Sequence, residues 1–289
     1  MGKVLIITDS NSGILQSEAK ELGIYVIPMP FTINAEEFEE EISISQEKFY
    51  EMLGEDADVK TSQPSQFLLE ELWDKKLKEY DEIVYIPMSG GLSATCENAT
   101  KYAKKYGGKV FVVNNQRISV TQKNSVFEAK KLADEGKSGA EIKELLEQDA
   151  KKQSIYIMLG TLKYLRRGGR ISATAATLGS LLKIKPILFS DGGKFEKFGM
   201  ALNNAQAKRK MIDQVKSELV KKFKDEYESG KLVISVAHTQ NFDEAEKFKN
   251  EILKEFPNVK FNYVDPLSLS VACHIGPGAL AIAVCSNNY

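Results

Sequence analysis

Residues Ile83 to Thr100 read IVYIPMSGGLSATCENAT, and this stretch is the most informative part of the sequence. An apolar, strand-like run ends at Pro87, and a loop of glycine and hydroxyl residues then leads into a predicted helix. Backbone N–H groups at a helix start lack intrahelical acceptors, and the hydroxyls of Ser89, Ser93 and Thr95 would lie beside them. The pattern indicates a site for a carboxylate or phosphate, but an ordinary capped helix start after a buried strand explains the same residues.

The first half of the chain repeats this order of strand and loop. Short β-branched runs occur at Val4 to Ile7, Ile83 to Ile86 and Val110 to Val113, and helix-like stretches separate them. This order is typical of a parallel sheet in an α/β fold. The loops after these runs would lie at the edge where open α/β sheets bind ligands.

The second half predicts another α/β domain. A capping box at Ser138 to Glu141 starts a helix that ends near Lys151, so we expect an N-terminal domain at 1–153 and a C-terminal domain at 154–289. Asp191-Gly192-Gly193 predicts a hairpin, which makes the second sheet mixed.

Composition excludes several classes of protein. The 289 residues include 39 Lys and Arg against 40 Asp and Glu, so no net field attracts nucleic acid. Three cysteines without a Cys-x-x-Cys pair favour reduced thiols in the cytoplasm, and only two histidines disfavour a metal site. The most apolar stretch, Leu267 to Cys285, is interrupted by His274 and Gly276-Pro277-Gly278, so we expect no transmembrane segment.

Three further groups of residues are candidates for a site. Thr61 and Ser62 lie in a hydroxyl-rich turn, in which Ser65 is placed to cap the next helix. Arg170 belongs to a basic turn around Gly168-Gly169, which is either a solvated face or a place to orient a carboxylate. His274 precedes a Gly-Pro-Gly turn and is either a core histidine or a ligand group, whereas His238 is expected at the surface.

Five motifs in register resemble the DegV family of bacterial lipid-binding proteins, which includes the fatty-acid-binding subunits of bacterial fatty acid kinase. The motifs are Thr8-Asp9-Ser10, Thr61-Ser62-Gln63-Pro64-Ser65, Ser89-Gly90-Gly91-Leu92-Ser93-Ala94-Thr95, Gly168-Gly169-Arg170-Ile171-Ser172 and His274-Ile275-Gly276-Pro277-Gly278.

The resemblance implies a two-domain α/β protein that binds a long-chain fatty acid such as palmitate between the domains, for transport or for presentation to a separate fatty acid kinase subunit. It implies that Thr61 and Ser93 hold the carboxylate, and that no cofactor or catalytic residue is needed. The expected ligand-binding residues are Thr61, Ser62, Gly91, Ser93, Ala94, Thr95, Arg170, His274 and Ile275. The family's usual Arg-Thr pair appears here as Leu202-Asn203, which puts docking of a kinase partner in doubt.

Two other functions remain open from the sequence. A serine-dependent acyl hydrolase would use Ser93 as nucleophile and His274 as base, with Asp9 or Asp265 as acidic partner, but the Gly-x-Ser-x-Gly elbow is absent. A phosphate- or nucleotide-binding protein follows from the same helix start, but the chain has no Gly-x-Gly-x-x-Gly turn.

Overall fold

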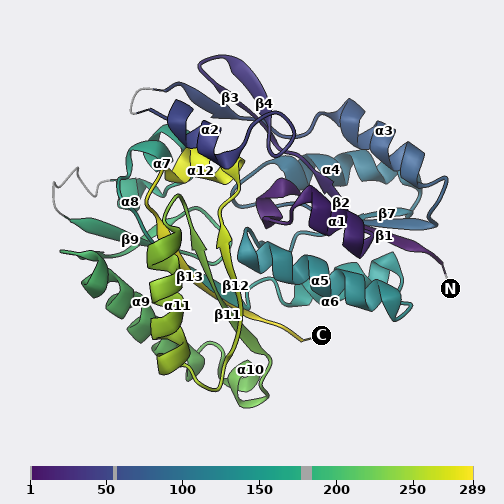
Figure 1. Ribbon diagram of the computed structural model, residues 1–289. Coiled ribbons are helices and arrows are strands. Elements are labelled where there is room, and N and C mark those ends of the chain that lie inside the picture. The colour runs from purple at the N-terminus through teal and green to yellow at the C-terminus, as the bar shows by residue number, and fades with distance from the viewer. Residues whose placement is uncertain (1, 55–56, 177–183, 289) are drawn as a thin grey trace. The chain divides into compact units, whose positions relative to one another are not determined.

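The computed structural model describes residues 2–54, 57–176 and 184–288 (Figure 1). The chain divides between Lys151 and Lys152 into two compact units, which we call the N-terminal and C-terminal units. Both units contain β-sheet and helices, and the expected α/β class is confirmed.

The main sheet of the N-terminal unit has four strands in the order β2-β1-β6-β7, and every neighbouring pair is parallel. This confirms the parallel sheet predicted from the β-branched runs. The strands are β1 (Val4–Asp9), β2 (Tyr25–Ile27), β6 (Glu82–Ile86) and β7 (Val110–Val112).

Helices cover both faces of this sheet (Figure 1). Successive side chains of a strand point to opposite faces, so Ile6 packs in one core and Leu5 in the other. The first face is covered by α1 (Gln16–Leu22), α5 (Val120–Asp134) and α6 (Gly139–Gln148). The second face is covered by α3 (Gln66–Lys76) and α4 (Thr95–Ala103). Two 3-10 turns complete the helical segments: η1 (Ser10–Ser12) follows β1, and η2 (Lys104–Tyr106) follows α4. Burial on both faces explains why the strands are continuous apolar runs.

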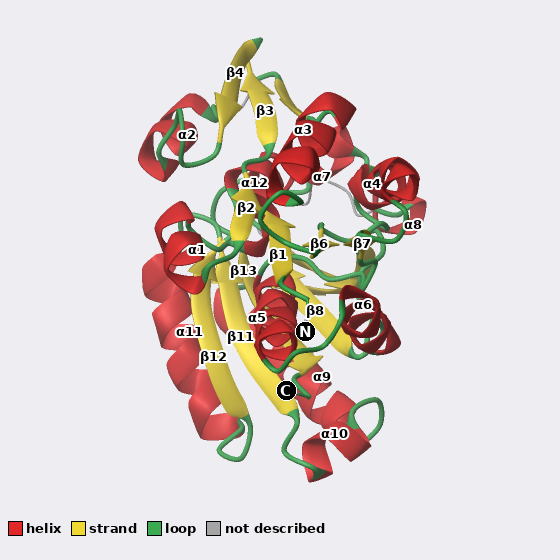
Figure 2. Cartoon of the chain, turned by 90° about the vertical axis from the view of Figure 1, so that its right-hand side faces the viewer, coloured by secondary structure: helices red, strands yellow, loops and turns green. Residues whose placement is uncertain are grey.

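A second, antiparallel sheet of three strands carries the Thr61 turn. Its order is β4-β3-β5, and Phe31, Phe38 and Phe49 pack together between it and a short helix. Figure 2 shows β3 and β4 as a small layer with α2 beside it. The elements are β3 (Pro30–Ile33), β4 (Glu36–Glu39), α2 (Gln46–Met52) and β5 (Val59–Thr61).

The C-terminal unit has a mixed sheet of six strands in the order β10-β9-β8-β13-β11-β12. Only the β11–β12 pair is parallel, and the other four pairs are antiparallel, which confirms the expected mixed sheet. The strands are β8 (Gln153–Met158), β9 (Lys185–Ser190), β10 (Glu196–Ala201), β11 (Leu232–His238), β12 (Lys260–Pro266) and β13 (Leu280–Ser286).

Two long helices cover one face of the mixed sheet, α9 (Asn204–Leu219) and α11 (Phe242–Glu255) (Figure 1). Their apolar sides, including Met211 and Phe248, form one core with Ile234 and Ile282 of the strands. Helices α7 (Lys163–Gly168) and α12 (Leu269–Ile275) contact each other. The shorter α8 (Ala173–Ala176) and α10 (Lys224–Glu228) complete the unit.

Candidate functional site

Ser93 and Thr95 form a pair of hydroxyl groups at the start of α4. Ser93 Oγ lies 2.8 Å from Thr95 Oγ1 and accepts a hydrogen bond from the Thr95 N–H at 3.2 Å. Thr95 is buried, with 2% of its surface exposed, whereas Ser93 is half-buried. Ser93 is therefore the member of the pair that a ligand can reach.

The loop before this pair uses its own N–H groups internally. Every backbone N–H from Met88 to Ser93 donates a hydrogen bond inside the unit, at distances of 2.8 to 3.3 Å. The acceptors are Asp9 Oδ2, the Arg117 carbonyl, Asn114 Oδ1, and the hydroxyl and carbonyl of Ser89. These loop N–H groups, which precede the start of α4 at Thr95, are therefore not available to an anion. Between Met88 and Thr95, within the described residues, only the Ala94 amide lacks an acceptor.

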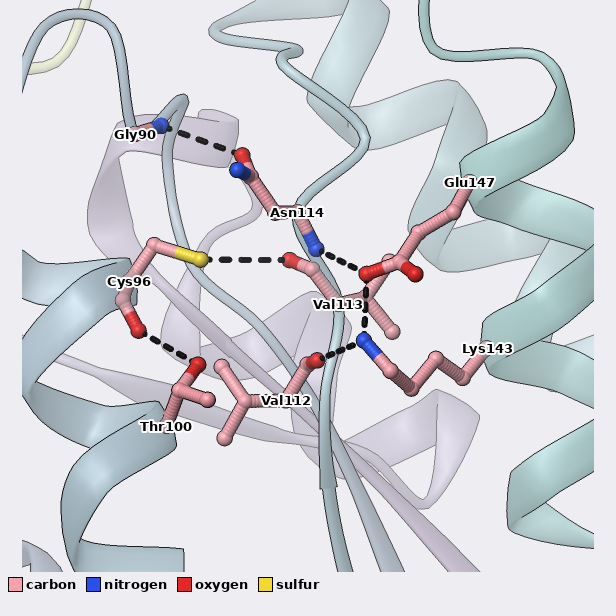
Figure 3. Close-up of polar contacts among 8 residues, drawn as sticks. All are labelled: Gly90, Cys96, Thr100, Val112, Val113, Asn114, Lys143 and Glu147. Carbon is pink, nitrogen blue, oxygen red and sulfur yellow. Dashed lines mark hydrogen bonds and ion pairs between the residues drawn. The ribbon is translucent and has the colours of Figure 1, made fainter.

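Asn114 attaches the loop to the end of the sheet, as Figure 3 shows. Its side chain accepts from Gly90, and its N–H donates to Glu147 Oε1 at 2.8 Å. Lys143 in α6 pairs with the same Glu147 and donates to the Val112 carbonyl at 2.6 Å. The loop is thus braced by β7 and α6, which keeps the start of α4 in one position.

Two buried ionisable residues near the loop, Cys96 and Asp9, do not supply a nucleophile. Cys96 donates weakly to the Val113 carbonyl at 3.8 Å, and burial raises the pKa of its thiol to about 11, so it stays a neutral thiol (Figure 3). Asp9 is completely buried, and burial raises the pKa of its carboxyl.

Both oxygens of Asp9 are occupied within the N-terminal unit. Oδ1 accepts from the Asn11 backbone, the Asn11 side chain and Gln122 Nε2 at 3.0 to 3.1 Å, and Oδ2 accepts from the Met88 N–H at 2.9 Å. These four bonds give Asp9 a role in holding the loop. They argue against Asp9 as the acidic partner of His274 in the hydrolase alternative, for which Asp265 was the other candidate.

The Thr61 turn is tied to the Ser93 helix. Asn98 in α4 donates from Nδ2 to Gln63 Oε1 at 3.0 Å, which brings the two hydroxyl-rich turns next to each other. Thr61 ends β5 and is half-buried, whereas Ser62 is exposed. Ser65 caps α3 as predicted, because its Oγ accepts from the Leu68 N–H at 3.2 Å.

In the C-terminal unit, the structure brings Arg170 and His274 together. Arg170 Nη1 donates to the Gly168 carbonyl at 2.5 Å, and the His274 ring packs against Gly168. Burial and the nearby positive charge of Arg170 lower the pKa of His274 to about 4. The imidazole is therefore neutral at physiological pH, and Ile275 is buried beside it at the end of α12.

Thr239 holds the Gly-Pro-Gly turn, and sequence reasoning missed it. Its hydroxyl donates to the Gly276 carbonyl at 2.6 Å and accepts from the Ala279 N–H at 2.9 Å. Gly276 has φ 75° and ψ 176°, which only glycine adopts readily. The expectation that His238 lies at the surface is wrong, because only 6% of it is exposed. Burial lowers the pKa of His238 as well.

Leu202 and Asn203 differ in what their side chains do in the structure. Asn203 is the N-cap of α9, and its side chain accepts from the Gln206 N–H at 2.9 Å. Leu202 is 72% exposed, so its side chain contributes little to the core of the unit.

Within the described residues, no helix combines the length and the apolar composition needed to cross a membrane.

The comparisons with known proteins agree over nearly the whole chain. The sequence model of the family described as "Uncharacterised protein, DegV family" matches residues 3–287. A DegV domain-containing protein of Staphylococcus aureus strain N315 is 30% identical over 287 residues, covering 98% of this chain and 99% of its own.

Two solved structures share the fold. A DegV family protein from Thermus thermophilus, described as binding fatty acid, has 28% identity and a TM-score of 0.84, with 98% of this chain and 99% of its own covered. DegV of Bacillus subtilis, described as a fatty acid binding protein, has 27% identity and a TM-score of 0.81, with 99% of this chain and 100% of its own covered. Because the family match extends over almost every residue and the fold agrees, this protein belongs to the DegV family.

Proposed function

We propose that this protein binds a long-chain fatty acid such as palmitate, with the carboxylate held by Thr61 and Ser93. The observation that carries the proposal is the half-buried Ser93 hydroxyl, which Thr95 holds at 2.8 Å and which lies on the helix tied to the Thr61 turn by the Asn98–Gln63 bond. The fatty acid binding described for the relatives from Thermus thermophilus and Bacillus subtilis supports the same ligand class.

Hydroxyl groups suit this task because most loop amides are already used. Between Met88 and Ser93 the N–H groups have internal acceptors, so the side chains at this point of the chain must supply the donors. A carboxylate left without donors in a buried place is costly, and each charge-assisted hydrogen bond contributes about 1.5–3 kcal/mol. We propose Ser62, Gly91 and Ala94 as neighbouring contacts, with the Ala94 N–H as an additional donor.

In the C-terminal unit, we propose that Arg170, His274 and Ile275 also contact the ligand. Arg170 supplies the cation, whereas His274 stays neutral because its pKa is about 4 and offers a neutral hydrogen bond. The buried Ile275 side chain gives an apolar contact beside them.

The acyl tail supplies most of the affinity. An acyl chain of about 15 methylenes, buried at ~0.8 kcal/mol each, gains roughly 12 kcal/mol before ordering losses. This gain exceeds the contribution of the head-group hydrogen bonds. The role that we propose for these bonds is to set the direction in which the lipid lies. On this view the protein binds and presents the lipid without its own catalysis, and a separate kinase subunit is the partner we propose.

Mass spectrometry of the intact purified protein tests the proposal. We expect bound fatty acid, or its appearance after incubation with palmitate, because a ligand held by a buried tail dissociates slowly. Protein that stays free of lipid after this incubation would contradict the proposal. Release of a hydrolysed acyl ester would favour the hydrolase instead, and co-purified nucleotide would favour the third class.

A further inference from the structure

The chemistry of a carboxylate restricts how Ser93 can bind it. An ionised carboxylate only accepts hydrogen bonds, and a serine hydroxyl has one proton to donate and two lone pairs that accept. If Ser93 binds a carboxylate, its single proton points to the ligand. Both lone pairs then need donors from the protein or remain unused.

Thr95 provides two contacts to the same oxygen. Its backbone N–H donates to Ser93 Oγ at 3.2 Å, and an N–H cannot act in the reverse direction. Its hydroxyl lies 2.8 Å from Ser93 Oγ, where either oxygen can be the donor while no ligand is bound. Once the Ser93 hydroxyl donates its hydrogen bond to a carboxylate, the Thr95 hydroxyl must be the donor in its contact with Ser93 Oγ. Ser93 Oγ then donates once and accepts twice, which is its full capacity.

An ordinary helix-capping role does not account for the Thr95 hydroxyl. The N-cap of α4 is Ala94, which makes no side-chain bond, so capping does not use this hydroxyl. Thr95 is 2% exposed, so its hydroxyl lies inside the N-terminal unit, where it contacts Ser93 Oγ. The local turn bond from the Thr95 N–H explains its backbone contact, but the hydroxyl contact at 2.8 Å is additional.

We propose that Thr95 is a positioning residue that holds Ser93 as a hydrogen-bond donor and thereby makes the site selective for head groups that accept. The inference rests on the proposed binding of a fatty acid carboxylate at Ser93. A carboxylate satisfies such a donor, and an alkylammonium group, which only donates, does not. A primary alcohol accepts less strongly than a carboxylate because it carries no charge.

Binding of palmitate, hexadecanol and hexadecylamine to the intact chain tests this selectivity. We expect the unmodified protein to prefer palmitate over both other ligands. Thr95→Val keeps the backbone N–H and the β-branch but removes the hydroxyl, so Ser93 is free to accept as well as donate. We expect palmitate affinity to fall roughly fivefold while hexadecanol affinity is retained, and Thr95→Ser to restore palmitate binding to within about twofold.

A double variant separates positioning from folding. In a Ser93→Ala background the oxygen that Thr95 orients is gone, so Thr95→Val should cause no further loss of palmitate affinity. Retained hexadecanol binding shows that each variant is folded. An unchanged ratio of palmitate to hexadecanol affinity in Thr95→Val would overturn the inference alone. Failure of the unmodified protein to bind palmitate would overturn the proposed function and the inference with it.

Discussion

Gly168 and His274 are in such close contact that a Cβ atom at Gly168 would lie 2.0 Å from Nδ1 of the imidazole. The two residues come from α7 and α12, which are separated in the sequence by most of the C-terminal unit. The absence of a side chain at Gly168 is therefore what allows the ring to sit beside the Gly168 carbonyl that Arg170 binds. The relative positions of Gly168, Arg170 and His274 therefore depend on this one contact.

Gly168→Ala should disturb both folding and ligand binding. The added methyl group must displace the His274 ring or the α7 backbone, and such overpacking costs typically about 1–3 kcal/mol. We expect a lower free energy of unfolding in urea and weaker palmitate binding. The matched control is Gly199→Ala in the same unit, where an added Cβ meets nothing within 4 Å. Equal effects at Gly168 and Gly199 would show that the contact with His274 is unimportant.

Thr61→Ala and Ser93→Ala should each weaken palmitate binding by about 1–3 kcal/mol while the protein stays folded, because each leaves the carboxylate one donor short. Titration calorimetry measures the loss. Ser65→Ala is the control, since Ser65 caps α3 through the Leu68 N–H. It should cost about 1 kcal/mol of stability and leave binding unchanged. Similar binding losses in all three variants would mean that the turn has a structural role only.

Exchanging Leu202-Asn203 for Arg-Thr should improve the response of a fatty acid kinase subunit. Leu202 is 72% exposed, and a guanidinium there can pair with a partner carboxylate that leucine leaves unmatched. We expect faster acyl-phosphate formation with unchanged palmitate affinity.

Asn203→Thr alone is the control for this exchange, because threonine keeps a side-chain cap for α9 and adds no charge. If the unmodified protein already supports the kinase at the rate of a family member with Arg-Thr, the docking surface lies elsewhere. Arg166, Arg167 and Arg170 are then the next residues to replace.

Stability should fall as the pH is lowered from about 6.5 to about 4, partly because of His274. In this window the unfolded chain protonates its histidines, whereas folded His274 remains neutral until about pH 4, so unfolding takes up a proton. Urea unfolding of the ligand-free protein across this range measures the effect. The slope of the unfolding free energy against pH is set by the number of protons taken up on unfolding, and His274→Gln should reduce that number by up to about one. Since burial lowers the pKa of His238 too, part of the dependence should persist. Identical slopes in the two proteins would be inconsistent with a depressed pKa at His274.

The sequence by itself determined the features that depend on neighbouring residues. The β-branched runs that became β1, β6 and β7 predict the parallel sheet, because strands buried on both faces are continuous apolar runs. The caps at Ser65 and Ser138 were also predictable, since a cap bonds an N–H three residues away. The Asp191-Gly192-Gly193 turn correctly placed β9 and β10 as an antiparallel pair.

The tertiary structure decided which of the candidate groups are available to a ligand. The N–H groups of Met88 and Ser89 donate to Asp9 and Arg117 across 79 and 28 residues respectively, and no local pattern predicts these partners. Burial of Thr95 and His238 depends in the same way on which elements pack over them. A local pattern shows which groups can form hydrogen bonds, but it does not show which distant partners fold against them, because those contacts arise only when the sheets and helices pack together.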